Sequence, residues 1–162
     1  TSDHCDGFGI AFFFFNACRL FVDNQSAVES PIAELIRNYP IKSRNVIAHI
    51  RKATQGKITL ENSHPFVREL WGRQWIFAHN GDLHGFEPTL SGRFTPIGNT
   101  DSELSFCYLL DQLVQKFGYE EPSLDQIFDL LLEDIKYETN CKKTVCHFAD
   151  GYDGFWRLFG LC

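Results

Sequence analysis

Residues 7–22 read GFGIAFFFFNACRLFV, and this stretch decides the fold class. Residues 7–15 are apolar, rich in phenylalanine and too short for a helix, so they predict a buried strand. Residues 18–22 predict a second strand, and the intervening Asn16–Ala17 fits a turn. We therefore expect an antiparallel hairpin near the start of the chain.

A short helix and two further strands follow this hairpin. Ser30 before Pro31 predicts a helix start, with serine as the N-cap and proline at the first helical position. Pro40 ends this helix, whose apolar face is marked by Ile32, Leu35 and Ile36. Residues 45–50 and residues 74–78 are typical of strands.

Two longer helices and a closing hairpin complete the pattern. Thr100 and Glu103 fit a capping box, and Gly118 fits the end of the helix that they begin. Its apolar positions are Phe106, Leu109, Leu110, Leu113 and Phe117. Ser123 begins the last helix, with an apolar face of Leu124, Ile127, Phe128, Leu131 and Ile135. Residues 145–149 and 155–161 predict a hairpin around Asp150–Gly151. This order indicates an α+β fold with mostly antiparallel strands.

Length and composition favour one folded domain, residues 1–162. The net charge of −6 argues against a general nucleic-acid binder. No apolar run approaches the roughly 18 residues of a membrane span. The six cysteines lack C-x-x-C spacing, and we see no signal-peptide pattern. We expect a cytoplasmic protein with reduced, mostly buried thiols, no metal site and no cofactor.

Charge is unevenly placed along the chain. Residues 37–57 hold six basic residues and no acidic one, whereas residues 101–138 hold ten acidic and two basic residues. Such runs usually form solvated faces. A sharper interpretation is a cleft between them that suits a zwitterion such as an amino acid.

Polar motifs stand at the ends of the apolar strands and at one helix start. They read DGFG at 6–9, HIRKAT at 49–54, NSHP at 62–65, AHNG at 78–81 and TDSE at 100–103. Each has a structural interpretation on its own: Asn80–Gly81 favours a hairpin turn, and Asp101 suits a first helical turn. The functional hypothesis depends on their joint order.

In this order the motifs resemble the class II glutamine amidotransferases, in particular the stand-alone bacterial branch of that family. Residues 64–73, HPFVRELWGR, are also similar to that branch. The likeness is strong over residues 6–106 and weaker beyond. It implies the αββα four-layer sandwich of the N-terminal-nucleophile hydrolases, and an enzyme that releases ammonia from the side-chain amide of glutamine.

The resemblance also implies how the substrate is held. Arg51 would bind the α-carboxylate of glutamine, because a guanidinium can hold both carboxylate oxygens. Asp101 would bind the α-amino group, and Thr54 would add a contact.

Four further residues are implied at the reacting amide. The side chain of Asn80 and the backbone N–H of Gly81 would form the oxyanion hole. His64 and His79 would be supporting residues and not general bases.

The family's nucleophile is a cysteine at the mature N-terminus, whose thiolate would form a γ-glutamyl thioester. Thr1 and Cys5 stand too close to Asp6 to take this place, so we expect the nucleophile strand, and a C-terminal segment, to lie outside residues 1–162. Three alternatives stay open: a γ-glutamyl peptide hydrolase acting on glutathione-like compounds, a non-catalytic binding subunit, and a hydrolase using Thr1. The expected partners are glutamine or a γ-glutamyl substrate, an acceptor enzyme on another chain and a second copy of the chain.

Overall fold

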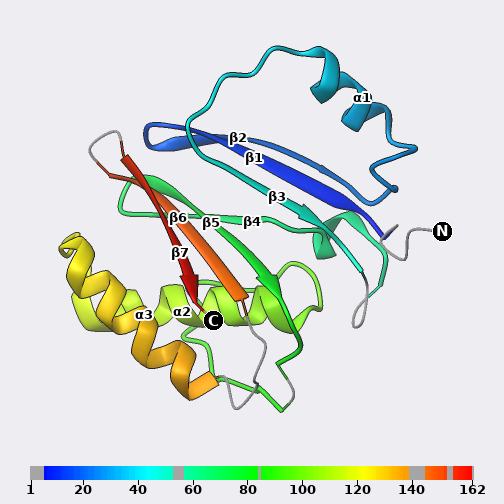
Figure 1. Ribbon diagram of the computed structural model, residues 1–162. Helices are drawn as coiled ribbons and strands as arrows, with labels where there is room; N and C mark the ends of the chain where they lie inside the picture. Colours follow the sequence, from blue (N-terminus) through cyan, green and yellow to red (C-terminus); the bar gives the residue numbers. More distant parts are fainter. Residues whose placement is uncertain (1–5, 53–56, 84, 139–144, 153–154, 162) are drawn as a thin grey trace.

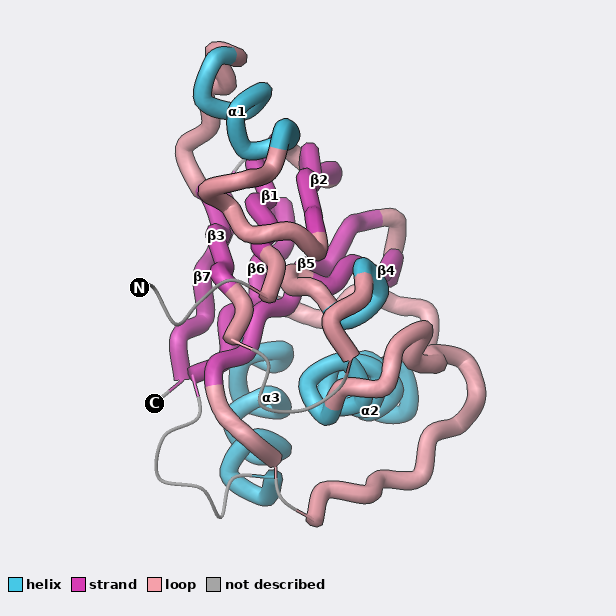
Figure 2. The backbone as a smooth tube through the Cα atoms, turned by 90° about the vertical axis from the view of Figure 1, so that its right-hand side faces the viewer, coloured by secondary structure: helices cyan, strands magenta, loops and turns pink. Residues whose placement is uncertain are grey.

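The computed structural model describes residues 6–52, 57–83, 85–138, 145–152 and 155–161. These residues form four layers (Figure 1). Helix α1 (Pro31–Asn38) covers a three-stranded sheet, and this sheet faces a four-stranded sheet that is covered by helices α2 (Asp101–Phe117) and α3 (Leu124–Glu138). Figure 2 shows α1 at one end of this stack and the α2–α3 pair at the other. The expected αββα sandwich is confirmed.

The first sheet has the order β2-β1-β3 and is antiparallel throughout. Its strands are β1 (Phe8–Phe14), β2 (Ala17–Asp23) and β3 (Val46–Ile50). The predicted hairpin of β1 and β2 is confirmed, but its turn is Phe15–Asn16 and not Asn16–Ala17, because Ala17 already pairs with Phe14. Ser30 caps α1 as predicted, because its side chain accepts hydrogen bonds from the backbone N–H groups of Ile32 and Ala33. The predicted apolar face is only partly right, since Leu35 is 55% exposed.

The second sheet has the order β4-β5-β6-β7 and is also antiparallel. Its strands are β4 (Phe66–Leu70), β5 (Arg73–Asn80), β6 (Val145–Tyr152) and β7 (Phe155–Leu161). Strand β4 was not predicted. The closing hairpin is confirmed, but the turn position is wrong: Asp150 and Gly151 pair with Arg157 and Trp156 inside the ladder.

The two longer helices begin and end close to the predicted residues. The Thr100 side chain accepts a hydrogen bond from the Glu103 backbone N–H at 3.2 Å, and Gly118 ends α2 with a φ of 65°. The other half of the predicted capping box is absent. The Glu103 carboxylate instead accepts hydrogen bonds from the backbone of Ile97 and Gly98 and pairs with Arg68 at 2.5 Å.

The buried face of α3 differs from the prediction at Phe128, and the side chain of Ile135, which was placed on the same face, lies outside the described residues. Ile127 and Leu131 are fully buried as predicted, but Phe128 is 36% exposed and Leu130 is buried in its place. No helix within the described ranges is long and apolar enough to cross a membrane.

Strand β5 is the shared wall of two hydrophobic cores. Trp75 and Phe77 pack into the core beneath α2 and α3, whereas Ile76 and Ala78 pack against the first sheet. The alternation follows from the two-residue period of a strand. All four side chains are at most 1% exposed, so β5 is held on both faces up to the polar residues at its end.

Candidate functional site

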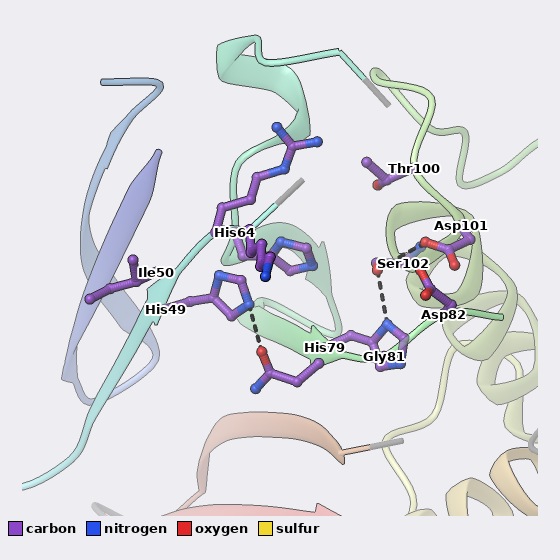
Figure 3. A pocket seen from close by; sticks show the side chains of 12 residues that line it. His49, Ile50, His64, His79, Gly81, Asp82, Thr100, Asp101 and Ser102 are labelled. Atoms are coloured by element: carbon purple, nitrogen blue, oxygen red, sulfur yellow. Dashed lines mark hydrogen bonds between the residues drawn. The ribbon is translucent and has the colours of Figure 1, made fainter. Parts of the chain in front are cut away.

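A cavity of about 210 Å³ lies where β3 and β5 end and α2 begins (Figure 3). Six of the seven residues singled out in the sequence line it: Arg51, His64, His79, Asn80, Gly81 and Asp101. Thr54 lies outside the described residues. The volume is below the roughly 300–1,000 Å³ of sites for drug-sized ligands, so it suits a small metabolite.

Arg51 supplies a buried positive charge to the cavity. Its backbone N–H donates to the Gly7 carbonyl at 2.9 Å, and its Nη1 donates to the Lys57 carbonyl at 3.1 Å. Burial lowers the pKa of Arg51, and the carboxylate of Asp6 acts in the opposite direction. An arginine stays charged at neutral pH even so. The side chain is 4% exposed, so its position is strongly constrained.

Asp101 supplies a negative charge at the first turn of α2. Its Oδ2 accepts from the Leu83 backbone N–H at 2.7 Å, and its Oδ1 accepts from the Ser102 backbone N–H at 2.7 Å and from the Ser102 hydroxyl at 3.2 Å. These bonds use three of the roughly four acceptor positions of a carboxylate. The carboxylate is thus held in place with capacity for one more donor.

Asn80 and Gly81 follow the buried part of β5. The Nε2–H of His49 donates to Asn80 Oδ1 at 3.0 Å, and Gly81 has a φ of 153°, which favours glycine. The hairpin interpretation of Asn80–Gly81 is wrong: β5 pairs with β4 and β6, and the chain continues from Gly81 toward α2.

Three buried histidines, His49, His64 and His79, line one side of the cavity. Figure 3 shows His49 and His64 facing Asp101 and Ser102 across it. Nδ1 of His79 donates to the Ser102 hydroxyl at 2.9 Å. Among the described residues, all the buried side-chain polar atoms that lack a hydrogen-bond partner belong to these histidines. Such atoms are typical of functional sites.

Burial lowers the pKa of all three histidines, most strongly that of His64. The rings are therefore neutral at pH 7. The part of the chain that the structure describes holds no group of three or more potential metal ligands.

We expect this histidine cluster to make the protein less stable in mild acid. The unfolded state binds protons near pH 6.5 and the native state only at lower pH, so stability is complete above about pH 6.5 and declines as pH falls below it. Urea unfolding between about pH 7.5 and 5.5 measures the decline. His64→Gln, which cannot titrate, should give a shallower pH dependence, and an unchanged slope would contradict this account.

The two described cysteine side chains are not candidates for a nucleophile. Cys18 and Cys107 are free thiols, as expected, and burial raises the pKa of each to about 11. The reactive form of cysteine is the thiolate, which such burial disfavours. Neither residue lines the cavity. Thr1 and Cys5, which the sequence argued against, lie outside the described residues.

Two contributors to the site were missed in the sequence, His49 and Ser102. Both stand inside the motifs that were singled out, His49 as the first residue of HIRKAT and Ser102 as the third of TDSE. Alternation along β3 could have found His49, since it shares a strand face with the buried Ile47. The basic and acidic segments also meet here, because Arg51 and Lys52 of the first and Asp101 of the second line the same cavity.

Known proteins share both this fold and this sequence pattern. The crystal structure titled "predicted glutamine amidotransferase from Pseudomonas aeruginosa PA01" matches with a TM-score of 0.74 and 40% identity, over all of this chain and 62% of that one. The family model described as "Glutamine amidotransferases class-II" matches residues 1–156. The chain therefore belongs to the class II glutamine amidotransferases.

Two curated relatives are similar over most of this chain. The Escherichia coli protein named "Putative glutamine amidotransferase YafJ" is 49% identical, over 85% of this chain and 60% of its own length. A Haemophilus influenzae protein named "Putative glutamine amidotransferase" is 53% identical, over 84% of this chain and 46% of its own length. The chain thus spans about half the length of these relatives.

Proposed function

We propose that this domain hydrolyses the side-chain amide of glutamine and releases ammonia. One observation carries the proposal: a buried cation, a held carboxylate and the Asn80–Gly81 donors line the same small cavity. A free amino acid carries a carboxylate and an ammonium group, so the two charges of the cavity complement its two ends. The similarity to proteins named as amidotransferases supports the choice of glutamine.

In this proposal the head group of the substrate lies between Arg51 and Asp101. Arg51 binds the α-carboxylate, and Asp101 accepts a hydrogen bond from the α-ammonium group. Thr54 adds a contact to the substrate. His79 acts on Asp101 through Ser102, because a continuous chain of hydrogen bonds joins the three side chains.

The reaction requires a cysteine thiolate as its nucleophile. The thiolate attacks the carboxamide carbon, and the amide oxygen becomes an oxyanion that accepts hydrogen bonds from Asn80 Nδ2 and Gly81 N–H. The leaving nitrogen takes up a proton and departs as ammonia. Water then hydrolyses the thioester, which yields glutamate and regenerates the thiol.

The test uses the full-length protein and measures ammonia release from glutamine and, separately, the release of glutamate and cysteinylglycine from glutathione. We expect release from glutamine. Both substrates share the glutamyl head group that Arg51 and Asp101 are proposed to bind. Cleavage of glutathione and not of glutamine would therefore identify the protein as a γ-glutamyl peptide hydrolase. Binding of glutamine without hydrolysis of either compound would assign the non-catalytic alternative. We place the activity in the cytoplasm, with an acceptor enzyme on another chain as the recipient of the ammonia.

We expect Arg51→Met to raise the KM for glutamine by about 10- to 100-fold, because a hydrogen bond to a charged group is worth roughly 1.5–3 kcal/mol. The effect on kcat should be much smaller, since the α-carboxylate is remote from the reacting amide. Steady-state kinetics of ammonia release separates the two constants. Arg44→Met is the matched control: Arg44 lies in the same basic segment, is exposed and does not line the cavity. An unchanged KM in Arg51→Met would contradict the assignment.

A further inference from the structure

His49 joins the two sheets of the sandwich at the site. It lies on β3 of the first sheet, whereas Asn80 ends β5 of the second, and the 3.0 Å bond from His49 Nε2 to Asn80 Oδ1 spans the layers (Figure 3). His49 is 9% exposed. The side chain that is proposed to stabilise the oxyanion is thus held by a residue from a different layer.

The protonation state of His49 decides what this bond does. A neutral imidazole carries one N–H, and burial keeps this ring neutral at pH 7. Nδ1 has no hydrogen-bond partner among the described residues, so a proton there would be buried without an acceptor. The proton therefore belongs on Nε2, where Asn80 Oδ1 accepts it.

We propose that His49 is a positioning residue that fixes the orientation of the Asn80 side-chain amide. With Oδ1 held by His49, the group left for the reacting amide oxygen is the donor Nδ2. The flipped amide would present its own oxygen to the developing negative charge. This inference rests on the proposed hydrolysis. It names the residue that orients Asn80 Nδ2 toward the oxyanion.

His64 and Gly9 hold the His49 ring in turn. The rings of His49 and His64 pack against each other with centroids 4.3 Å apart and planes tilted by 31°. Gly9 pairs with His49 across β1 and β3, and a Cβ on Gly9 would clash with the carbonyl oxygen of His64. Only glycine at this position lets the His64 backbone approach so closely. Gly9, the second glycine of the DGFG motif, thus contributes to the site because it allows the His64 backbone to pack closely beside His49.

The first test compares His49→Leu with His49→Gln in the full-length protein. Leucine has no donor, so we expect kcat for glutamine to fall about tenfold or more, yet by less than the roughly 10²–10³-fold of removing an oxyanion donor. The KM should change little. A glutamine side chain at position 49 carries an N–H close to the position of the histidine Nε2, so His49→Gln should have a higher kcat than His49→Leu. Val46→Thr, on the same strand but outside the cavity, is the control.

A double-mutant cycle separates positioning from a general structural role. If His49 acts through Asn80, His49→Leu should lower kcat no further once Asn80 is alanine. The same loss of kcat in both backgrounds would overturn the proposal, as would a rise in KM with kcat unchanged.

The ring tautomer gives a readout that does not need activity. We expect ¹⁵N NMR of the wild-type protein to show His49 protonated on Nε2 and not on Nδ1, and His49→Leu to shift the side-chain amide resonances of Asn80. The opposite tautomer, or an unmoved Asn80 amide, would overturn the proposal. If the wild-type protein hydrolyses neither substrate, the proposed function fails, and these spectra still decide whether His49 holds Asn80.

Discussion

Asn80→Ala is expected to lower kcat for glutamine hydrolysis by about 10²–10³-fold, which is the usual effect of removing one oxyanion-hole donor. The reason is that Asn80 Nδ2 meets negative charge that develops only as the thiolate attacks. The KM should change little, because the glutamyl head group is held by Arg51 and Asp101. Steady-state measurement of ammonia release by the full-length protein checks both constants.

The matched control is Asn38→Ala, at the exposed end of α1 and outside the cavity. It should leave kcat and KM as in the wild type. An Asn80→Ala protein with wild-type kcat would remove Asn80 from the oxyanion hole. An effect confined to KM would assign it to substrate binding instead.

Arg68→Met is expected to lower the free energy of unfolding by about 3 kcal/mol, which is typical of breaking a buried ion pair from one side. Glu103 is 1% exposed, so its charge stays buried when Arg68 is lost. The backbone N–H groups of Ile97 and Gly98 still bind this carboxylate and limit the loss. Urea unfolding measures the change, with the slope checked for a two-state transition.

Arg37→Met tests whether the loss of stability expected for Arg68→Met is caused by the burial of the ion pair. The Arg37–Glu34 pair joins side chains that are 75% and 67% exposed, and such pairs contribute little. The control should therefore unfold almost as the wild type does. Equal losses in the two variants would mean that the Arg68–Glu103 pair owes its effect to something other than burial.

Local sequence signals predicted the elements that local interactions decide. The β1–β2 hairpin, the Ser30 cap and the extent of α2 all depend on neighbouring residues, and all are confirmed. Strand β4 escaped because Arg68 and Glu69 interrupt its apolar pattern. Only the tertiary structure explains Arg68, which faces Glu103 of α2. The turn after β4 carries only half of the usual signal: Gly72 takes a positive φ of 72°, but Trp71 before it takes a positive φ of 56°, which a tryptophan rarely adopts.

In the candidate site, too, some features could be predicted from the sequence and others depend on the tertiary structure. Motif order identified six residues that the structure brings into one cavity. The bond from His49 to Asn80 could not be predicted, because it joins strands of different sheets whose stacking is a property of the whole fold. Glu103 was misread for a related reason: its spacing from Thr100 fits a capping box, but Arg68 and the backbone of residues 97–98 compete for its carboxylate.

The position of β5 between two cores has a consequence for folding cooperativity. A strand whose alternate side chains belong to both cores cannot leave one of them while the other persists, so the two cores should open together. The backbone amides of β5 then exchange with solvent only in the rarest, most extensive openings. The residues at the end of β5 inherit this rigidity, so the fold itself preorganises the backbone of Asn80 and Gly81, and His49 has only the Asn80 side-chain amide to orient.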